Sequence, residues 1–382
     1  MSRLEQLIEE LCPDGAEFKE LGEVVEILDY LRRPISKDKR EIGTYPYYGA
    51  NGILEYVKDY IFDGTFLLFG EDGSVINKDG SPILNWATGK IWVNNHAHVL
   101  SENKEVALLR YLYYYLSTID VTSIVRGVPP KINQQSLRTI SIPIPPLPIQ
   151  QEIVTILDTF TALDASLQAE LEARRKQYEH YRNQLMNFEE KEVEWKTLGE
   201  IGKVCMCKRV MKHETKSTGD IPFYKIGTFG KEADAYISQE LFEEYISKFS
   251  FPKKGDILIS ASGTIGRRVI YDAKPAYFQD SNIVWLSNNE KEILNKYLYY
   301  VYETIEWPVE GGTIKRLYND NFMKIKIPIP PLSEQERIVG ILDKFEALVS
   351  GELPAEIAAR RKQYEYYREK LLDFKQNNGI YM

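Results

Sequence analysis

Apolar side chains recur at helical spacing along a long segment in the middle of this chain. Over 150–188 they lie three, four and seven residues apart, as in Phe160, Leu163, Leu167 and Leu171. That spacing is typical of the seam of a coiled coil. We therefore expect one continuous helix over 150–188, about 58 Å long at 1.5 Å per residue.

A second helical segment covers 333–382. It carries Gly351 and Pro354, which predict a break or kink near 350–354. Two such helices packed antiparallel would hold two globular domains apart at a defined distance. The alternative is that each helix folds back on its own domain.

The other segments combine short apolar runs of β type with short stretches of helical spacing, as in mixed α/β domains. Apolar runs of β type at 65–69 and 256–260 lead into glycine-containing turns. Tyrosine-rich stretches at 108–116 and 293–302 are predicted to be helical. Leucine and valine are interleaved with these tyrosines at helical spacing, so we expect the rings to pack rather than to serve as stacking platforms.

The chain contains an internal repeat of roughly 180 residues. Ile-Pro-Ile-Pro-Pro-Leu occurs at 142–147 and again at 327–332. Ala-Arg-Arg-Lys-Gln-Tyr-Glu occurs at 173–179 and, one residue out of step, at 359–365, and Glu-Phe-Lys at 17–19 corresponds to Glu-Trp-Lys at 194–196. The proline-rich hexapeptide cannot be helical, so we expect it to form a stiff exit from each globular domain.

Between these repeated blocks the two copies diverge strongly, over 24–140 and 201–326. A duplicated frame with different contents suits a protein that reads two different half-sites on one long ligand. The fold class we predict is α+β, with two mixed α/β domains separated by two long antiparallel coiled-coil helical repeats in a pseudo-twofold arrangement. The predicted organisation is an N-terminal helix at 1–16, a first globular domain at 17–147, a central helical repeat at 148–193, a second globular domain at 194–332 and a C-terminal helical repeat at 333–382.

The overall charge limits how this chain could meet a nucleic acid. A net charge of -8 argues against a protein that coats nucleic acid by bulk charge, so any contact must be local. Three cysteines give no disulfide framework and fit a reducing cytoplasm, and Cys205-Met206-Cys207 offers too few ligands for structural zinc. No secretory signal and no long apolar run is apparent, so we expect a cytoplasmic protein without a membrane partner.

The ordered set of repeated motifs resembles the specificity subunit of type I restriction-modification systems. The motifs that carry it are the hexapeptide, the helix start Ser333-Glu334-Gln335-Glu336 and the Ala-Arg-Arg-Lys-Gln-Tyr-Glu block, and the resemblance covers essentially the whole chain. The resemblance implies that each globular region is a target recognition domain reading one half of a split double-stranded DNA target. It also implies that the helical repeats dock two methyltransferase subunits, which restriction subunits then join.

The same resemblance implies that this subunit itself performs no chemistry and needs no cofactor. S-adenosylmethionine, ATP and magnesium would belong to the partner subunits. In the first domain, 45–52 and 85–99 look like one common subtype of recognition domain, whereas the second domain resembles another. The helical repeats differ where Leu353-Pro354-Ala355 replaces Leu167-Gln168-Ala169, so they need not be equally bent and the half-site spacing stays open.

Two other classes of protein compete with this interpretation. A standalone DNA methyltransferase or nuclease would need catalytic motifs, and neither Asn-Pro-Pro-Tyr nor Asp-Pro-Pro-Tyr occurs to hold a flipped adenine. Gly263-Thr264-Ile265-Gly266 is not followed by a Walker lysine. His96 and His98 would point the same way from a strand, but no third metal ligand is evident. A coiled-coil scaffold would not explain why two large domains diverge inside a preserved frame.

Base readout requires amide and guanidinium groups, and phosphate contacts require lysine, arginine or small polar donors. We expect no catalytic and no metal-binding residues in this chain. The segments at 126–131 and 311–315 occupy equivalent places before the hexapeptide and are expected to be flexible loops that face DNA. The candidate DNA-binding residues are Lys90, Asn94, Asn95, His96, Arg126 and Lys131 in the first domain and Arg267, Arg268, Gln279, Asn282, Lys315 and Arg316 in the second.

Overall fold

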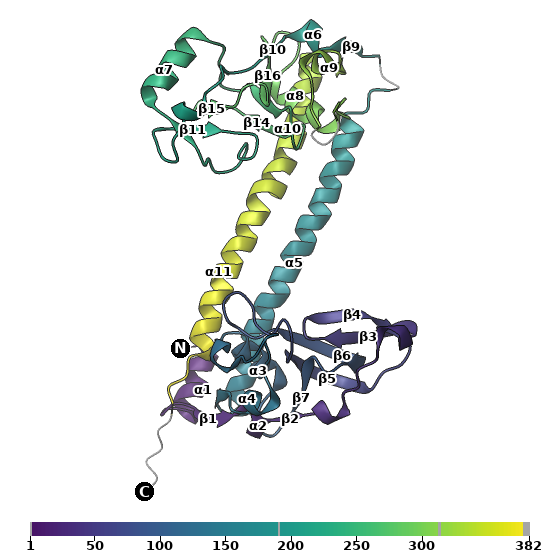
Figure 1. Cartoon of the computed structure of the whole chain (residues 1–382), viewed down its shortest axis with the longest axis vertical. Helices are drawn as coiled ribbons and strands as arrows, with labels where there is room; N and C mark the ends of the chain where they lie inside the picture. The colour runs from purple at the N-terminus through teal and green to yellow at the C-terminus, as the bar shows by residue number, and fades with distance from the viewer. Residues whose placement is uncertain (1, 190–191, 312–314, 377–382) are drawn as a thin grey trace. The chain divides into compact units, whose positions relative to one another are not determined.

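The computed structural model of the chain describes residues 2–189, 192–311 and 315–376. The chain divides into two compact units (Figure 1). Unit 1 contains the residues up to Gln168 together with those from Glu356 onwards, and unit 2 is Ala169–Ala355. Each unit therefore combines one globular domain, which we call a recognition domain after the resemblance above, with parts of the helical segments.

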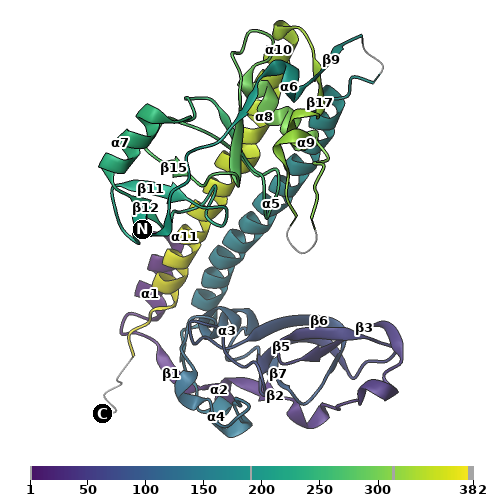
Figure 2. The ribbon, with the colours of Figure 1, turned by 45° about the horizontal axis from the view of Figure 1, so that its top comes forward.

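Unit 1 is built around a six-stranded sheet with the strand order β2-β7-β5-β6-β3-β4 (Figure 2). The alternating apolar residues of β5 are buried on both faces of the sheet, which explains the apolar run at 65–69. The strands are β2 (Val25–Ile27), β3 (Ile42–Gly49), β4 (Gly52–Val57), β5 (Phe62–Gly70), β6 (Leu84–Val93) and β7 (Ala97–Glu102).

Unit 2 divides its recognition domain between two smaller sheets. One has the order β10-β16-β13-β14 and the other β12-β11-β15. Their bounds are β10 (Lys203–Cys205), β11 (Ile221–Tyr224), β12 (Tyr236–Ile237), β13 (Ile257–Ser260), β14 (Arg268–Ile270), β15 (Tyr277–Phe278) and β16 (Ile283–Ser287), with helix α7 (Gln239–Lys248) beside them. The divergence of the two copies is therefore a difference in sheet architecture.

A short antiparallel strand pair closes each recognition domain. β1 (Glu17–Glu20) pairs with β8 (Ser141–Ile144), and β9 (Glu194–Thr197) pairs with β17 (Lys326–Ile329). The proline-rich hexapeptide thus begins as a paired strand and ends on the first residue of the long helix. Its prolines lie outside the helix, as predicted, and it joins each globular domain to its helical segment. A two-stranded sheet has only edges, where a proline without an N–H is tolerated. Small helices complete the frame: α1 (Arg3–Leu11), α2 (Leu21–Val24) and α4 (Gln134–Arg138) in unit 1, and α6 (Leu198–Ile201) and α9 (Asn319–Met323) in unit 2.

The predicted central helix is present as α5 (Leu147–Leu185), 39 residues long. It begins three residues earlier than expected and ends before Phe188. Within unit 1, Phe160 of α5 stacks on Tyr367 of α11 (Leu353–Leu372), and Asp164, one turn later, bonds to Arg361, one to two turns earlier in α11. The two helices therefore run antiparallel in unit 1, as predicted.

A break or kink was predicted near 350–354; the second helical segment stays helical there but leaves regular α-helical geometry. α10 (Leu332–Glu346) continues through the π-helical turns of η5 (Ala347–Glu352) into α11, in which Pro354 is the second residue. The hexapeptides are 185 residues apart but the Ala-Arg-Arg-Lys-Gln-Tyr-Glu blocks 186, so the second copy holds one extra residue here. Wider π turns absorb that residue and keep the later side chains on the same face.

The same polar contacts attach each recognition domain to its helix. Buried Gln150 accepts a hydrogen bond from the Leu108 N–H (2.9 Å) and donates to the carbonyls of Val106 (3.1 Å) and Pro145 (2.8 Å). Buried Gln335 makes the matching bonds in unit 2, with the Leu294 N–H and with the carbonyls of Glu292 and Pro330. Each recognition domain is thus fixed to the start of its helix.

The tyrosine-rich helices supply the other half of this attachment. They are α3 (Leu109–Leu116) and α8 (Asn295–Thr304). The Tyr111 hydroxyl donates to the Pro143 carbonyl (2.8 Å) and the Tyr114 hydroxyl to Asp158 of α5, and Tyr297 and Tyr300 repeat both bonds with Pro328 and Asp343. All four rings are buried, which confirms that these tyrosines pack.

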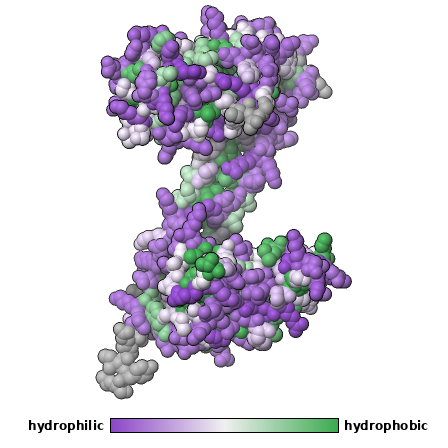
Figure 3. All heavy atoms as spheres, in the orientation of Figure 1, coloured by the Kyte–Doolittle hydropathy of each residue, from purple (hydrophilic) through white to green (hydrophobic). Residues whose placement is uncertain are grey.

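The predicted fold class is confirmed in its two mixed α/β domains and its long helices. Among the described residues, none of the helices combines the length and the apolar composition that crossing a membrane requires. The faces of both units drawn in Figure 3 are mostly hydrophilic.

Candidate nucleic-acid interface

One pattern of backbone hydrogen bonds gathers three segments at the end of each recognition domain. In unit 1 the Glu71 N–H donates to the His96 carbonyl (2.8 Å), the Ile132 N–H donates to the Glu71 carbonyl (2.9 Å), and Arg126 and Lys131 exchange two bonds of 2.8 Å. We call the segments 71–74, 94–96 and 126–131 loop cluster 1.

Unit 2 repeats this pattern with other residues. The Ala261 N–H donates to the Asn282 carbonyl (2.7 Å), the Leu317 N–H donates to the Ala261 carbonyl (2.9 Å), and Glu310 and Arg316 exchange two bonds. We call the segments 261–264, 280–282, 310–311 and 315–316 loop cluster 2. Different sheets therefore present geometrically equivalent loops.

The pattern also fixes which residues correspond between the two domains. Lys131 matches Arg316, because each exchanges backbone bonds with a partner before it and bridges to the turn after the central strand. The same 185-residue offset relates the hexapeptides. The segment that matches 126–131 is therefore 310–316, so the predicted range 311–315 was one residue short at each end. Residues 312–314 of that segment lie outside the described residues. His96 matches Asn282, and Asp72 matches Ser262.

Loop cluster 1 contains five of the six candidate residues of the first domain. Asn95 and His96 are exposed in the turn before β7, and Arg126 and Lys131 are exposed in the facing hairpin. Asn94 is buried, and its Oδ1 accepts the His96 N–H (2.8 Å), which holds this turn. Lys90 lies apart on β6, with its ammonium 4.6 Å from the Tyr60 ring centroid.

The candidate residues of unit 2 are more widely distributed. Asn282 and Arg316 belong to loop cluster 2, where Asn282 Oδ1 accepts from the Ser262 hydroxyl (2.9 Å) and Arg316 donates to the Ser281 carbonyl (3.1 Å). Lys315 is exposed beside Arg316.

Three other candidates already make contacts inside the second domain. Gln279 Oε1 accepts the Ile226 N–H (2.9 Å), and Arg267 donates to the Phe229 carbonyl (2.8 Å). Arg268 pairs with Glu303 and lies 4.3 Å over the Tyr299 ring. A DNA contact by any of the twelve candidates stays a prediction, and for these three it would require leaving a partner.

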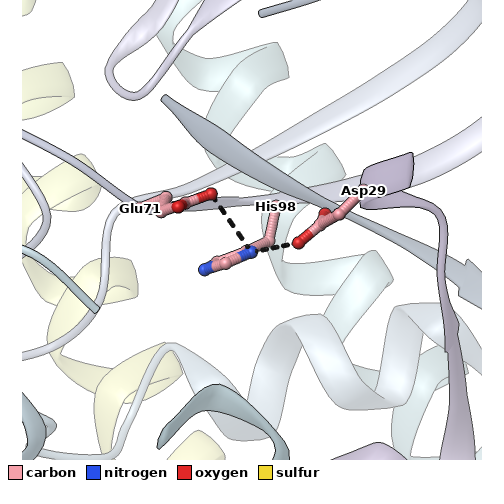
Figure 4. A group of neighbouring side chains, drawn as sticks. All are labelled: Asp29, Glu71 and His98. Carbon is pink, nitrogen blue, oxygen red and sulfur yellow. Dashed lines mark hydrogen bonds and ion pairs between the residues drawn. The ribbon is translucent and has the colours of Figure 1, made fainter. Parts of the chain in front are cut away.

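A buried ionic group that sequence reasoning missed lies directly behind loop cluster 1 (Figure 4). His98 Nδ1 is 2.5 Å from Asp29 Oδ2 and 3.5 Å from Glu71 Oε2, and its Nε2 is 2.8 Å from the Ile132 carbonyl. His96 lies outside the strand and is exposed, so the expectation that both histidines point the same way is wrong. His96 belongs to the turn, whereas β7 begins only at Ala97.

The donor types of Asp29, Glu71 and His98 would suit a metal ion, but the protein supplies its own cations there. Arg32 Nη1 lies 2.5 Å from Glu71 Oε2, Arg32 Nη2 lies 3.3 Å from Asp29, and Lys131 Nζ lies 3.0 Å from Glu71 Oε1. Both ring nitrogens of His98 face oxygen atoms of the protein. These residues therefore form an ion-pair network that ties Lys131 and the turn at Glu71 to the sheet.

The network predicts acid sensitivity. Burial alone would raise the pKa of Glu71, but the hydrogen bond from Arg32, the charge of His98 and the bond from Lys131 hold that pKa below the ordinary 4.5. A carboxylate whose pKa is lowered by folding stabilises the fold at pH values above its pKa in the unfolded chain. This stabilisation is lost as the pH falls through its pKa in the folded protein. Glu71→Gln should lower the free energy of unfolding by about 3 kcal/mol at neutral pH, as expected when one partner of a buried ion pair is removed. Its melting temperature should then fall less steeply than that of the wild type between about pH 5 and about pH 3.

The matched control is Glu41→Gln, which removes an exposed pair with Lys58 in the same domain. An exposed pair is worth about 0–1 kcal/mol, so this variant should follow the wild type at neutral pH. Parallel pH profiles for wild type and Glu71→Gln would contradict the role assigned to the network.

The chain is similar to known proteins along almost its whole length. Residues 13–173 and 190–359 each match the family described as type I restriction modification DNA specificity domain. A putative type I restriction enzyme specificity subunit of Haemophilus influenzae is 52% identical, over 97% of this chain and 98% of that protein. The specificity subunit of the type I restriction enzyme EcoR124I/EcoR124II of Escherichia coli is 31% identical, over 98% of this chain and 97% of its own.

A solved structure supports the fold independently of sequence identity. The type I restriction-modification S subunit from M. genitalium superposes with a TM-score of 0.60 at 16% identity, covering 93% of this chain and 96% of the other. Two family matches in one chain, in the segments that the internal repeat delimits, confirm the resemblance found in the sequence. The chain therefore belongs to the type I restriction-modification DNA specificity subunits.

Proposed function

We propose that this chain reads a bipartite double-stranded DNA target, with one half-site for each recognition domain. The observation that carries the proposal is the pair of equivalent loop clusters, which share backbone bonds but differ in side chains. Histidine and lysine in cluster 1 stand where asparagine and arginine stand in cluster 2. Different donors in equivalent places would read different bases.

The chemistry of the exposed groups fits direct readout. Arginine pairs bidentately with guanine and asparagine with adenine in the major groove, and lysine also contacts phosphates. Asn95, His96 and Lys131 would supply such groups in unit 1, and the half-buried Asn282 and Arg316 in unit 2. Lys131, Asn282 and Arg316 would first leave their partners Glu71, Ser262 and Ser281. The buried side chains behind them, Asn94 and Glu71, fix the loops, so binding need not order them first.

We further propose that the chain has no catalytic activity of its own and binds subunits that have it. Two methyltransferase subunits would dock on the duplicated helical frame and carry S-adenosylmethionine, and restriction subunits would carry ATP and magnesium. The repeated attachment at Gln150 and Gln335 supports two equivalent docking positions. The three free cysteines fit a complex that works in the cytoplasm.

The test is a map of modified adenines across the host genome, with and without this gene. We expect a methylated motif of two short sequences, separated by an unread gap, to disappear when the gene is deleted. The purified chain incubated with S-adenosylmethionine is the control and should leave DNA unmethylated. An unchanged set of modified adenines after deletion, or methyl transfer by the chain alone, would overturn the proposal.

A further inference from the structure

Both recognition domains contain a strongly basic loop that the candidate residues above do not include. Residues 32–40, basic loop 1, hold five lysines and arginines and one acid. Residues 208–216, basic loop 2, hold four lysines and arginines, one histidine and one acid. In a chain with a net charge of -8, two such loops are local exceptions.

The two loops hold the same position in their domains. Basic loop 1 follows β2, which pairs with β7, and basic loop 2 follows β10, which pairs with β16. β7 and β16 are the strands that leave the turns at 94–96 and 280–282. Each basic loop therefore begins beside its loop cluster.

The arginine side chains at the two ends of basic loop 1 are bonded to the rest of the domain. Arg32 bonds to Glu71 and to the Ala97 carbonyl (2.7 Å). Arg40 pairs with Glu55, donates to the Ile35 carbonyl (2.7 Å) and lies 4.5 Å over the Tyr47 ring.

Between these anchors the short helix η2 (Lys37–Lys39) presents two exposed lysines, and Arg33 is exposed as well. Within the described part of the chain, none of these three side chains has an ion pair. The Arg33 N–H donates to the carbonyl of Val93 (3.4 Å), directly before the turn of loop cluster 1.

Basic loop 2 is built in the same way from other contacts. Arg209 Nε is 2.8 Å from Asp280 Oδ2, in the turn of loop cluster 2. Lys216 and Tyr236 exchange two backbone bonds of 2.9 Å at the other end. Between them lies η4 (Lys212–Glu214), and the ammonium groups of Lys212 and Lys216 are exposed without an ion pair to any described residue.

From this arrangement we propose that basic loops 1 and 2 bind the DNA phosphates that flank the bases read by each loop cluster. The inference rests on the proposed function and adds the part of the interface that supplies affinity without sequence information. Fixed ends and unpaired central cations are suited to this task, because phosphate contacts position a protein on the duplex and release condensed counterions. Acidic surface elsewhere would restrict binding to these places.

The test is a salt titration of DNA binding by the full chain with its methyltransferase partner. Lys37→Ala/Lys39→Ala should lower the slope of log K against log salt by about 0.9 for each phosphate that the variant no longer neutralises. Near physiological salt, affinity should fall roughly 5-fold per lysine, or about 30-fold for both. The loss should be equal on specific and unrelated duplexes, and the methylated motif should not change.

The matched control is Lys19→Ala/Lys104→Ala, which removes the same charge from the same domain. Lys19 lies on β1 and Lys104 follows the far end of β7, outside the basic loop. This control should keep the wild-type slope. Melting temperatures should stay close to the wild-type value for both variants. Neither Lys37 nor Lys39 makes a described ion pair, and the pair of Lys19 with Glu17 is a surface pair worth about 0–1 kcal/mol.

The outcomes separate this inference from the proposed function. If the wild-type complex bound its target and unrelated DNA equally, the proposed function would be contradicted. A wild-type complex that does so, while Lys37→Ala/Lys39→Ala keeps the full slope or loses only specific binding, would overturn the phosphate role alone.

Discussion

Gln150→Leu is expected to destabilise unit 1 by at least about 3 kcal/mol, because it leaves three buried polar backbone groups without a hydrogen-bond partner. The side chain is fully buried and is the partner of one N–H and two carbonyls. Each buried polar group left without a partner costs about 1–3 kcal/mol. Leucine has a similar volume, so the cost comes from hydrogen bonding rather than from a cavity. Denaturant unfolding, with hydrogen exchange to localise the loss to α3 and β8, is the measurement.

The adjacent residue supplies the control. Gln151 is exposed, and Gln151→Leu should change the free energy of unfolding by less than about 0.5 kcal/mol. Gln335→Leu should repeat the large effect in unit 2. If Gln150→Leu and Gln151→Leu were equally stable, the attachment of the recognition domain to its helix would not depend on this side chain.

Exchanging 24–140 for the matching segment of a relative should replace one half of the target and leave the other half unchanged. All of loop cluster 1 and basic loop 1 lie inside this segment, whereas β1, β8 and α5 lie outside it. Removing the contacts to even two base pairs, at about 1–3 kcal/mol each, should lower affinity for the old target at least roughly 30-fold. The methylated motif of the exchanged protein is the measurement.

The structure adds one condition to the design of this exchange. The donor segment must carry tyrosines at the positions of Tyr111 and Tyr114, because their hydroxyls bond to Pro143 and Asp158 of the retained frame. Exchange of 201–326 is the reciprocal control and should change only the other half. A change of both halves by either exchange would show that the domains do not read independently.

Much of the fold could be predicted from the sequence because repetition and period are local signals. The heptad spacing gave α5 to within a turn, and the interleaved leucines gave buried tyrosines in α3 and α8. The pairing of the hexapeptide as a strand could not be predicted from its prolines, because proline excludes a helix but not an edge strand. Only the repeated Glu-Phe-Lys and Glu-Trp-Lys blocks could have suggested its partner. At Gly351 and Pro354 the one-residue difference between the repeat offsets pointed to an inserted residue in the helix.

The candidate site was less predictable because its geometry depends on distant residues. Asp29, Arg32, Glu71 and His98 meet only after the sheet forms, so the buried partner of Lys131 could not be read from neighbouring letters. Residue type alone also could not separate exposed His96 from buried Asn94, two positions apart. The basic loops, in contrast, were visible as runs of charge, and only their place beside the loop clusters required the structure.

The first and last described segments of the chain meet in unit 1, and this has a consequence for biosynthesis. The Ala16 N–H bonds to the Lys375 carbonyl (3.0 Å), and a side chain at Gly15 would collide with that carbonyl. Leu4 and Ile8 of α1 share the core of unit 1 with Tyr364, Leu371 and Phe374. A ribosome that has finished the first recognition domain at residue 147 must still add more than 200 residues before Phe374 can cover this core. A chain cut short by a premature stop codon would leave apolar surface of α1 and α5 exposed to chaperones and proteases. Truncated chains would therefore be degraded before they could join a complex.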